Sequence, residues 1–384
     1  MTTSSLVVFP FKAERPEVVL ANIRVAAAHE RVGEVVCVGY EVESTYRAIE
    51  AARHDIEVET GTPVRLMLQE RIGVLRPGKG DGMNTGLRYL LGTDHDRLHF
   101  YDSDITSFDA RWITRAEEAA DAGYGVVRHS SPRASTDGMI TWFVTRPGLA
   151  ILFPRSQLPW IEQPLGGEML LTRPVAEMLA ADTRVAERSD WGIDTAITFA
   201  LVCRAVPTYE VSMPQGKSHA LYRGLTDLKT MLVECFDAVQ SLRGLEVPAG
   251  IVHRAEPPLE VPETITTKVG YDVEATLRLL GHGWSDRQAA LLGHFPPPVR
   301  DGMLAVAGGP VFGFMTDDLW YDTHRTALDH FDMTDPNWNE VLFRLWVVRV
   351  RAYTMSIALR GHGYAMRSLR DMMNGYLRRS ALER

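Results

Sequence analysis

The chain has 384 residues, 45% of them hydrophobic, which is enough for two globular domains or for one domain with a large extension. Its formal net charge of -8 comes without a run of basic residues, so a nucleic-acid-binding protein is disfavoured, because such proteins cluster Lys and Arg against phosphate. The three cysteines, Cys37, Cys203 and Cys235, are widely spaced and form no Cys-x-x-Cys pair, so neither a disulfide framework nor a zinc site is indicated.

The apolar stretch near the N-terminus, residues 5–10, is too short for the core of a signal peptide and is followed at once by Lys12. No apolar run reaches the roughly 18 residues that a membrane span requires. We therefore expect a cytoplasmic protein in a reducing compartment, with no membrane partner.

Short β-branched runs alternate with helical patterns over the first half of the chain. The predicted strands cover residues 6–9, 35–39, 64–69 and 98–101, and the predicted helices cover residues 17–29, 44–53, 82–91 and 110–123. This rhythm is typical of an α/β fold with a doubly wound parallel sheet. Ligands bind beyond the carboxyl ends of the strands in such sheets.

Amphipathic helical patterns dominate after about residue 225. They cover residues 225–242, 273–280, 286–292 and 339–360, and they are separated by Pro-rich and Gly-rich connectors at residues 246–262 and 294–298. We expect a nucleotide-binding domain over residues 1–222 and a mainly helical region over residues 223–384. An exposed apolar stripe along residues 342–359 would serve self-association in a homo-oligomer, but we favour a fully buried core helix as its explanation.

Asp102 and Asp104 follow the predicted strand 98–101, and their side chains leave on the same face if the chain is still extended there. Two such carboxylates can hold one Mg²⁺ or Mn²⁺, which offsets the charge on a departing diphosphate, as a nucleotide-sugar transferase requires. The alternative is a capping or turn pair before the next helix. The similar Asp94-His95-Asp96 precedes the strand, so we expect a solvated turn there.

The segment 69–84 is rich in glycine and basic residues, follows a strand and opens a helix. Lys79 and the free amides at the helix start would supply positive potential to a diphosphate. The segment lacks the Gly-Lys-Ser/Thr order of a mononucleotide kinase loop. A flexible surface loop is the alternative, because such loops are commonly glycine-rich and charged.

Two further residues are candidates for the same site. Asp194, which precedes the apolar run 195–202, can orient sugar hydroxyls or stabilise positive charge at the reacting carbon, but it can also be a first-turn helix carboxylate. His219, in the segment 216–222, is a candidate metal ligand, although a lone His is more often structural.

These motifs resemble those of the mannosylglycerate synthase family. The resemblance includes Leu75-Arg76-Pro77-Gly78-Lys79-Gly80-Asp81-Gly82-Met83-Asn84-Thr85 and Phe100-Tyr101-Asp102-Ser103-Asp104, and it extends over nearly the whole chain. Its further blocks are residues 10–12, 68–71, 127–129, 132–137, 160–168, 189–195 and 231–236. Several of these blocks are long and unusual in composition, which makes the match specific.

The resemblance implies a GT-A-like nucleotide-sugar-binding domain and a helical part that helps close the site. The implied reaction moves mannose from GDP-mannose to D-glycerate with retention of the α configuration, giving a compatible solute. Asp104 and His219 would bind Mg²⁺ or Mn²⁺, and Asp102, Asp104 and Asp194 would act in catalysis. The residues implied for the donor are Pro10, Phe11, Lys12, Gln69, Lys79, Asp102, Leu165, Gly167, Asp194, Tyr222 and Met231.

By the same resemblance, Arg133 would pair with the acceptor carboxylate, since its planar guanidinium matches a carboxylate in two places. The stretch Asp137, Gly138, Met139, Ile140 and Thr141 would complete the acceptor pocket. The chain departs from the family at Ser103 and at Ser130-Ser131, and the smaller pair beside the acceptor loop leaves lactate, glycolate or another hydroxy acid open as acceptors.

Retention permits two mechanisms. One forms a covalent sugar-enzyme intermediate, and the other is front-face attack by the glycerate hydroxyl while the departing diphosphate takes the proton. We favour front-face attack, because no residue is an obvious nucleophile. A nucleotide-sugar hydrolase or pyrophosphorylase would use the same sheet and metal, and a noncatalytic nucleotide-binding module would need neither an acceptor arginine nor a full metal site.

Overall fold

The structure, a computed structural model, describes residues 4–218, 224–248, 253–256, 271–306, 309 and 311–383. The chain divides into two compact units. The first comprises Met1–Pro132, Ile161–Ala220 and Gly250–Pro262, and the second comprises Arg133–Trp160, Leu221–Ala249 and Glu263–Arg384. Residues 133–160 therefore group with helices that come much later in the chain. A domain boundary at residue 222, and a role of the helical part in closing the site, stay predictions.

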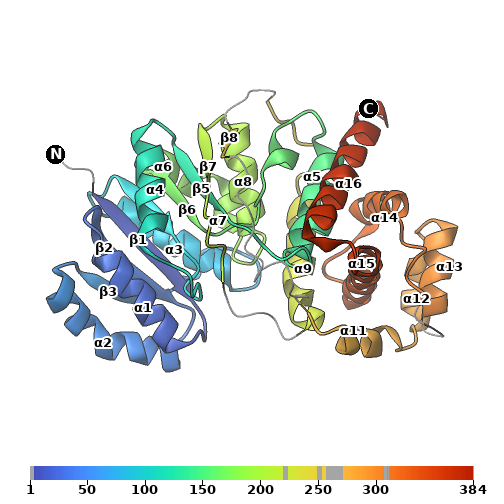
Figure 1. The fold of residues 1–384 in the computed structure, drawn as a ribbon, viewed down its shortest axis with the longest axis horizontal. Helices are drawn as coiled ribbons and strands as arrows, with labels where there is room; N and C mark the ends of the chain where they lie inside the picture. Colours follow the sequence, from blue (N-terminus) through green and yellow to red (C-terminus); the bar gives the residue numbers. More distant parts are fainter. Residues whose placement is uncertain are drawn as a thin grey trace. The chain divides into compact units, whose positions relative to one another are not determined.

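Within the described residues, an eight-stranded sheet lies at the centre of the first unit, in the order β3-β2-β1-β4-β6-β5-β7-β8 (Figure 1). All neighbouring strands are parallel except β6, which is antiparallel to both β4 and β5. The predicted α/β sheet is confirmed, and the antiparallel β6 is an addition to it. The strands are β1 (Ser5–Phe11), β2 (Val32–Gly39), β3 (Val64–Leu68), β4 (Arg97–Phe100), β5 (Val126–Ser130), β6 (Met169–Thr172), β7 (Thr208–Ser212) and β8 (His253–Ala255).

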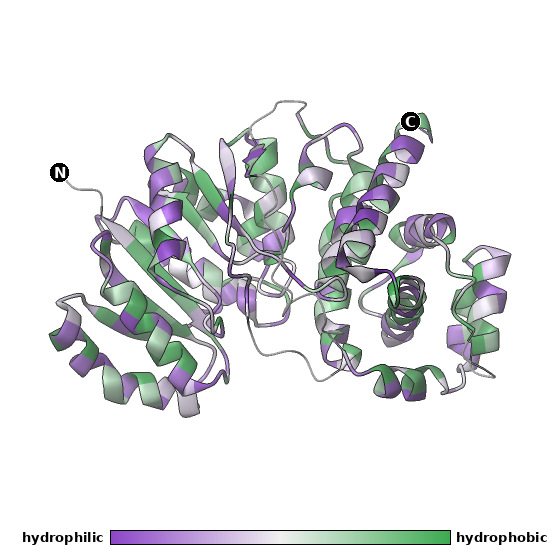
Figure 2. Ribbon diagram, in the orientation of Figure 1, coloured by the Kyte–Doolittle hydropathy of each residue, from purple (hydrophilic) through white to green (hydrophobic). Residues whose placement is uncertain are grey.

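Strand β1 shows why the sheet is hydrophobic on both sides. Successive side chains of a strand point to opposite faces, so Val7 and Phe9 enter one core whereas Leu6 and Val8 enter the other. Strand β1 is accordingly hydrophobic along most of its length (Figure 2). A sheet of this kind must be covered by helices on both faces.

The helices of the first unit supply these covers. α1 (Pro16–Ala27), α2 (Ser44–Thr60) and α4 (Ala110–Asp121) pack on the face of Val7. α3 (Lys79–Leu91), α6 (Arg173–Ala181), α7 (Thr183–Glu187) and α8 (Ile193–Cys203) lie on the opposite face. α2 runs seven residues past its predicted end at Arg53 and stops before Gly61, which adopts the left-handed conformation at φ 74° that favours glycine.

The second unit is helical in the part that the structure describes. Its helical elements are η1 (Thr141–Thr145), α5 (Arg146–Leu152), η2 (Leu158–Trp160), η3 (Leu225–Leu228), α9 (Lys229–Gln240), α11 (Val273–Leu280), α12 (Asp286–Leu292), α13 (Pro297–Val306), α14 (Asp317–His330), α15 (Pro336–Ile357) and α16 (Gly361–Glu383). η1 is a π-helix that continues directly into α5. None of the described helices is long and apolar enough to cross a membrane.

α15 is the core helix of the second unit. It packs against α9 and α12, and its residues 341–351 are all buried. The apolar stripe predicted at residues 342–359 therefore follows the core interpretation over most of its length, although Met355 and Leu359 are exposed. A self-association surface is not needed to explain it.

The two predicted connectors turn out differently. Of the first connector, residues 249–252 and 257–262 lie outside the described part of the chain, and residues 253–255 form β8. The second connector, residues 294–298, is shorter than predicted, because α13 begins at Pro297. Proline is compatible with the first turn of a helix, where its missing N–H has no intrahelical partner to lose.

Candidate active site

Five charged side chains of the first unit form an alternating series of ion pairs. Nζ of Lys217 lies 2.5 Å from a carboxylate oxygen of Glu168 and 2.5 Å from one of Asp102. Nζ of Lys79 lies 3.6 Å from Asp102 Oδ1 and 2.9 Å from Asp194 Oδ2. We call these five residues the charge ladder.

Most members of the ladder stand at the end of a strand or at the start of a strand or helix, and this places them at one edge of the sheet. Asp102 follows β4 and Glu168 precedes the antiparallel β6, so the two carboxylates lie at the same edge. Lys79 opens α3, and Asp194 stands in the first turn of α8. This edge, at the carboxyl ends of the parallel strands, is where open α/β sheets bind their ligands.

Lys217 was not among the predicted site residues. Its two neighbours are held by the turn that follows the Asp102–Asp104 motif: Ser107 Oγ donates to the carbonyl of Gly216 at 2.9 Å, and the Thr106 amide donates to that of Ser218 at 2.7 Å. The sequence places Lys217 two residues before His219, and this proximity was the only signal available for it. Its role depends on contacts across more than 100 residues of chain.

The ladder perturbs the acidity of its carboxyl groups. Burial disfavours charge on Asp102, but Lys217 and Lys79 outweigh it and hold the Asp102 pKa well below its usual range. Burial raises the pKa of Glu168, and the charge of Asp102 raises it further. Burial also raises the pKa of Asp194, which Lys79 offsets only in part. Asp102 is therefore the carboxyl group of the ladder whose pKa is lowered, because two lysines lie next to it.

Only one of the two carboxylate oxygens of Asp194 forms a hydrogen bond. Oδ2 accepts a hydrogen bond from Lys79, whereas the buried Oδ1 has no hydrogen-bond partner among the residues that the structure describes. An unsatisfied buried carboxylate oxygen is costly, and such an atom is commonly completed by a ligand. Asp194 does stand in the first turn of α8, as in the alternative considered for it, and its functional role stays a prediction.

Gly167 packs directly against the ladder. A Cβ atom at this position would lie 2.6 Å from Lys79 Nζ and 2.9 Å from Asp102 Oδ1, closer than carbon can approach either atom. Leu165 is half-buried in the turn just before it. The implied donor residues Gly167, Lys79 and Asp102 are thus brought together by the fold.

Asp104 lies in a turn, so the same-face argument from an extended strand does not apply to it. The turn is nevertheless acidic. Burial raises the pKa of Glu14 to about 7, and the negative charges of Asp104 and Asp102 add to this rise. Half-buried carboxylate oxygens in a negative field suit a hard cation such as Mg²⁺ or Mn²⁺.

Of the remaining metal and donor candidates, only some belong to the part of the chain that the structure describes. His219 and Tyr222 lie outside the described residues. Within the described residues no group of three or more His, Cys, Asp or Glu side chains is arranged to hold a metal ion. Met231 is half-buried in α9 of the second unit. The metal roles of Asp104 and His219 stay predictions.

Pro10 and Gln69 flank the start of α3. A Cβ atom on Gly82 would lie 3.4 Å from Pro10 Cβ and 3.6 Å from Gln69 Oε1, so both residues line the same helix turn. Lys12 is exposed, and its Nζ lies 3.7 Å from the centre of the Tyr40 ring. Phe11 is buried in the core of the sheet, so only its backbone is open to a ligand.

The glycine-rich segment 69–84 is held in a defined shape. The buried Asp81 accepts hydrogen bonds from the amides of Ile72 and Gly73, at 3.0 and 2.8 Å, and pairs with Arg71. Added Cβ atoms on Gly73 and Gly80 would meet the backbone of residues 187–189. These two glycines therefore serve the packing of the segment itself, which is not a flexible surface loop.

The implied acceptor residues Arg133 and Asp137 to Thr141 all belong to the second unit. Gly138 adopts φ 67°, and Arg133 Nη1 lies 3.7 Å from where its Cβ would be. The Gly138 amide donates a 2.7 Å hydrogen bond to Asp137 Oδ1. The fold thus gathers Arg133 with the turn that starts the helical run through Thr141.

Asp94-His95-Asp96 lies at the opposite end of β4. Asp96 accepts a hydrogen bond from the Ser4 amide at 3.2 Å, and His95 Nδ1 lies 2.9 Å from Ser4 Oγ. Both aspartates are exposed. The motif fixes the start of the sheet, as expected for a turn remote from the ligand edge.

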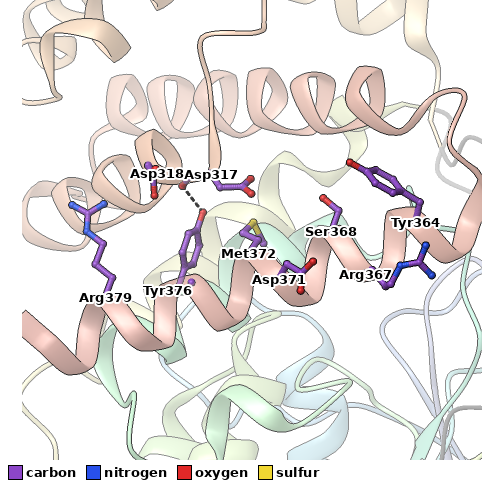
Figure 3. A pocket seen from close by; sticks show the side chains of 10 residues that line it. Asp317, Asp318, Tyr364, Arg367, Ser368, Asp371, Met372, Tyr376 and Arg379 are labelled. Atoms are coloured by element: carbon purple, nitrogen blue, oxygen red, sulfur yellow. Dashed lines mark hydrogen bonds between the residues drawn. The ribbon is translucent and has the colours of Figure 1, made fainter.

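The second unit also contains a cavity of about 430 Å³ between α16 and the start of α14 (Figure 3). Its lining mixes charges of both signs, with Asp317, Asp318 and Asp371 near Arg367 and Arg379. None of the predicted site residues lines it.

Comparison with known families covers both units. The family described as "Mannosylglycerate synthase, GT domain" matches residues 5–241, and "Mannosylglycerate synthase C-terminal domain" matches residues 265–373. A mannosylglycerate synthase of Rhodothermus marinus is 57% identical over 99% of this chain and 96% of its own. A mannosylglycerate synthase of Selaginella moellendorffii is 53% identical over 96% of this chain and 88% of its own.

A solved structure shares the fold at lower identity. Glucosyl-3-phosphoglycerate synthase from Mycobacterium tuberculosis, in complex with Mn²⁺, uridine diphosphate and glucosyl-3-phosphoglycerate, matches with a TM-score of 0.50 and 20% identity. The match covers 64% of this chain and 81% of that one. The expected GT-A-like fold is confirmed by this similarity.

Proposed function

Because the chain belongs to the mannosylglycerate synthase family and is a glycosyltransferase, we propose that it transfers mannose from GDP-mannose to D-glycerate with retention of the α configuration. The observation that carries the proposal is the charge ladder with the unsatisfied Oδ1 of Asp194. It offers ammonium groups to a diphosphate and a carboxylate oxygen to the sugar beside it.

The donor would bind along the ladder. Lys79 and Lys217 are held by carboxylates, and a diphosphate can replace those carboxylates as their anionic partner. Asp194 Oδ1 would accept a sugar hydroxyl, and its charge would stabilise positive charge at the reacting carbon. Pro10, Gln69 and Gly167 would bound this part of the site.

We assign the metal to Asp104, with His219 as the second ligand and Asp102 beside them. The acidic turn around Asp104 and Glu14 supports this assignment. Mg²⁺ or Mn²⁺ at this position would offset the charge that develops on the departing diphosphate. The structurally similar glucosyl-3-phosphoglycerate synthase is described in complex with Mn²⁺ and a nucleoside diphosphate.

We assign the acceptor to the turn of the second unit. Arg133 lies beside Gly138 and offers a planar pair of donors to a carboxylate. Asp137, Met139, Ile140 and Thr141 complete the turn, and the backbone amides at the start of its helical run favour an anion. A glycosylation acceptor that is a small hydroxy acid fits this set.

The ladder also bears on the choice of mechanism. A covalent mechanism would need a carboxylate nucleophile, and two buried carboxylates of the ladder are engaged in ion pairs: Asp194 pairs with Lys79 and Glu168 pairs with Lys217. Pairing with an ammonium group reduces the nucleophilicity of a carboxylate. We therefore favour front-face attack, and mass-spectrometric trapping of a glycosylated Asp194 or Glu168 would overturn that preference.

The direct test is a panel of nucleotide sugars and small hydroxy acids, with products identified by mass and by the anomeric configuration in NMR. We expect mannosylglycerate in the α configuration from GDP-mannose and D-glycerate. Product formed equally well from lactate or glycolate would reassign the acceptor. Release of GDP and mannose without any acceptor would indicate a hydrolase, and turnover of GTP with mannose 1-phosphate would indicate a pyrophosphorylase.

The metal assignment has its own test. Glycerate-dependent GDP release should require Mg²⁺ or Mn²⁺ and should fall by several orders of magnitude in Asp104→Ala, because the variant loses a ligand of the ion. The matched control is Asp94→Ala, which alters the exposed motif at the other end of β4 and should retain activity. Full activity of the wild type in excess chelator would contradict the assignment.

A further inference from the structure

Two aromatic side chains of α15 hold the backbone of the turn that carries the acceptor residues. Tyr353 Oη donates to the carbonyl oxygen of Ser135 at 3.0 Å, and Trp346 Nε1 donates to that of Met139 at 3.2 Å. The two donors are seven residues apart on α15, which places them on the same face of the helix. One helix, α15, therefore forms hydrogen bonds to the turn both before and after Gly138.

A third aromatic side chain, from α14, holds the π-helix that follows. Trp320 Nε1 donates to the carbonyl oxygen of Phe143 at 2.9 Å. The ring of Phe143 also packs edge-on against Tyr353, with the ring centres 5.3 Å apart. We call Trp320, Trp346 and Tyr353 the aromatic clamp.

The clamp is buried, so its hydrogen bonds are not exchanged for water. Trp346 is 0% exposed, Trp320 is 1% exposed and Tyr353 is 3% exposed. Trp320 and Trp346 would lose their acceptors if the turn moved away, and Tyr353 would keep only a longer 3.4 Å hydrogen bond to the Ala365 carbonyl. An unsatisfied buried donor costs more than the bond itself contributes. The turn therefore has one strongly preferred position relative to α14 and α15.

The clamped segment has the irregular backbone that needs such support. Gly138 takes φ 67°, and residues 141–145 form a π-helix, which is rare and is frequently found at functional sites. Arg133 packs against Gly138 within this segment. The position of its guanidinium thus depends on where the clamp holds the turn.

We propose that the aromatic clamp sets acceptor specificity, by fixing the turn 135–143 so that Arg133 and the amides after Gly138 meet one size of hydroxy acid. This inference rests on the proposed function, since it takes that turn as the acceptor site. Trp320, Trp346 and Tyr353 are positioning residues, because they act through the backbone of the turn.

Further contacts from α14, α15 and α16 hold the aromatic clamp in place. The buried Arg349 of α15 lies 4.7 Å from the centre of the Phe143 ring and pairs with Asp317 at the start of α14. Tyr376 of α16 donates to the Asp317 carbonyl at 2.8 Å (Figure 3). The clamp therefore belongs to the rigid core of the second unit.

The test is Tyr353→Phe, which keeps the buried ring and removes only the hydroxyl that holds Ser135. We expect a rise of about five-fold in the KM for the acceptor, the size of one lost neutral hydrogen bond, with the KM for GDP-mannose unchanged. The ratio of kcat/KM for D-glycerate to that for lactate should fall, because a looser turn discriminates less. That ratio does not depend on the fraction of folded enzyme, so a loss of stability alone cannot move it.

Tyr321→Phe is the matched control. Tyr321 is also buried in the second unit, and its hydroxyl bonds Ser380 and Glu383, each at 2.9 Å, both away from the acceptor turn. It should lose similar stability but keep the acceptor ratio. Trp346→Phe is the second test variant, because it removes the bond to Met139 and should act like Tyr353→Phe.

Hydrogen exchange gives a readout that does not depend on turnover. Amides of residues 138–145 should exchange faster in Tyr353→Phe than in wild type or Tyr321→Phe. An unchanged exchange rate, or an acceptor ratio that shifts no more than in Tyr321→Phe, overturns the clamp. Failure of the wild type to glycosylate any hydroxy acid would instead overturn the proposed function, and with it the specificity role.

Discussion

At the scale of single residues, the closeness of Lys79 and Asp102 depends on the absence of a side chain at position 167. Because a Cβ there would lie 2.6 Å from Lys79 Nζ, we expect Gly167→Ala to push the ammonium away from the ladder. Donor KM should rise and kcat/KM should fall at least about ten-fold, equivalent to about 1.4 kcal/mol. Steady-state kinetics with varied donor will measure this.

The control for that variant is Gly92→Ala. Gly92 ends α3 in the same unit, and a Cβ there would meet only the Tyr89 carbonyl at an ordinary 3.5 Å. Both variants should melt within a few degrees of the wild type. Equal kinetics in the two variants would show that the ladder tolerates displacement of Lys79.

The sequence predicted three residues of the charge ladder but missed Lys217. Asp102, Lys79 and Asp194 each stand at the end of a predicted strand or the start of a helix, so the binding rule for α/β sheets selects them one by one. Lys217 carries no such signal, because its place is set by hydrogen bonds from Thr106 and Ser107. Contacts between distant loops have no local periodicity that a sequence would reveal.

At the scale of elements, Arg344 joins α15 to the end of α11. It is buried, its guanidinium lies 3.6 Å from the centre of the Trp284 ring, and it donates to the carbonyls of Leu280 and Gly283 at 3.3 Å. These carbonyls have no further helical turn to bond. Arg344 therefore completes the carboxyl end of α11.

We expect Arg344→Met to lower the free energy of unfolding by about 2–3 kcal/mol, because buried carbonyls lose a charged donor. Urea unfolding will measure the loss, and amide exchange should localise it to α11. Arg278→Met is the control: its exposed pair with Glu274 should contribute less than about 0.5 kcal/mol. A similar loss in both variants would argue against the capping role.

The elements that periodicity found are those with a single uninterrupted pattern, such as α4 and α15. The run from η1 through α5 was not predicted, because Pro147 and Gly148 interrupt it and both residues disfavour a helix interior. Pro147 stands inside this continuous run and cannot donate to the Phe143 carbonyl four residues before it, which accepts from Trp320 instead. The direction of β6 could not be read from its composition, since the same hydrophobic residues suit a parallel or an antiparallel strand.

At the scale of the whole molecule, acid sensitivity is expected to come partly from buried histidines. Burial lowers the pKa of His324 to about 3, whereas an unfolded chain titrates histidine near 6.5. Between these values the unfolded state binds more protons, so stability is full above pH 6.5 and is lost as pH falls towards 3.

We expect His324→Leu to flatten this loss by up to about 1.4 kcal/mol per pH unit within the window. Leucine suits the site because His324 packs against Phe236 and Trp320. Denaturant midpoints measured from pH 7.5 down to pH 4 will give the slope. His54→Leu, at an exposed position, should leave the slope as it is in the wild type.

The division of the chain could be predicted only in part. The change from alternating strands and helices to helices alone is visible in the sequence near residue 225. The grouping of residues 133–160 with the late helices is not, because it arises from contacts such as the bond between Trp320 and Phe143, 177 residues apart. Long-range packing of this kind is decided by the complete core rather than by any local pattern.

In the charge ladder, the positive charges of the two lysines are neutralised by carboxylates of the protein itself. Its three carboxylates already pair with the ammonium groups of Lys79 and Lys217, so under the proposed function an anionic donor would have to displace those carboxylates. The same carboxylates would compete for the lysines after transfer and would help to displace the nucleotide product. Such a site would have a lower affinity for the donor but a faster release of the nucleotide product. Faster release raises turnover where product release limits the rate.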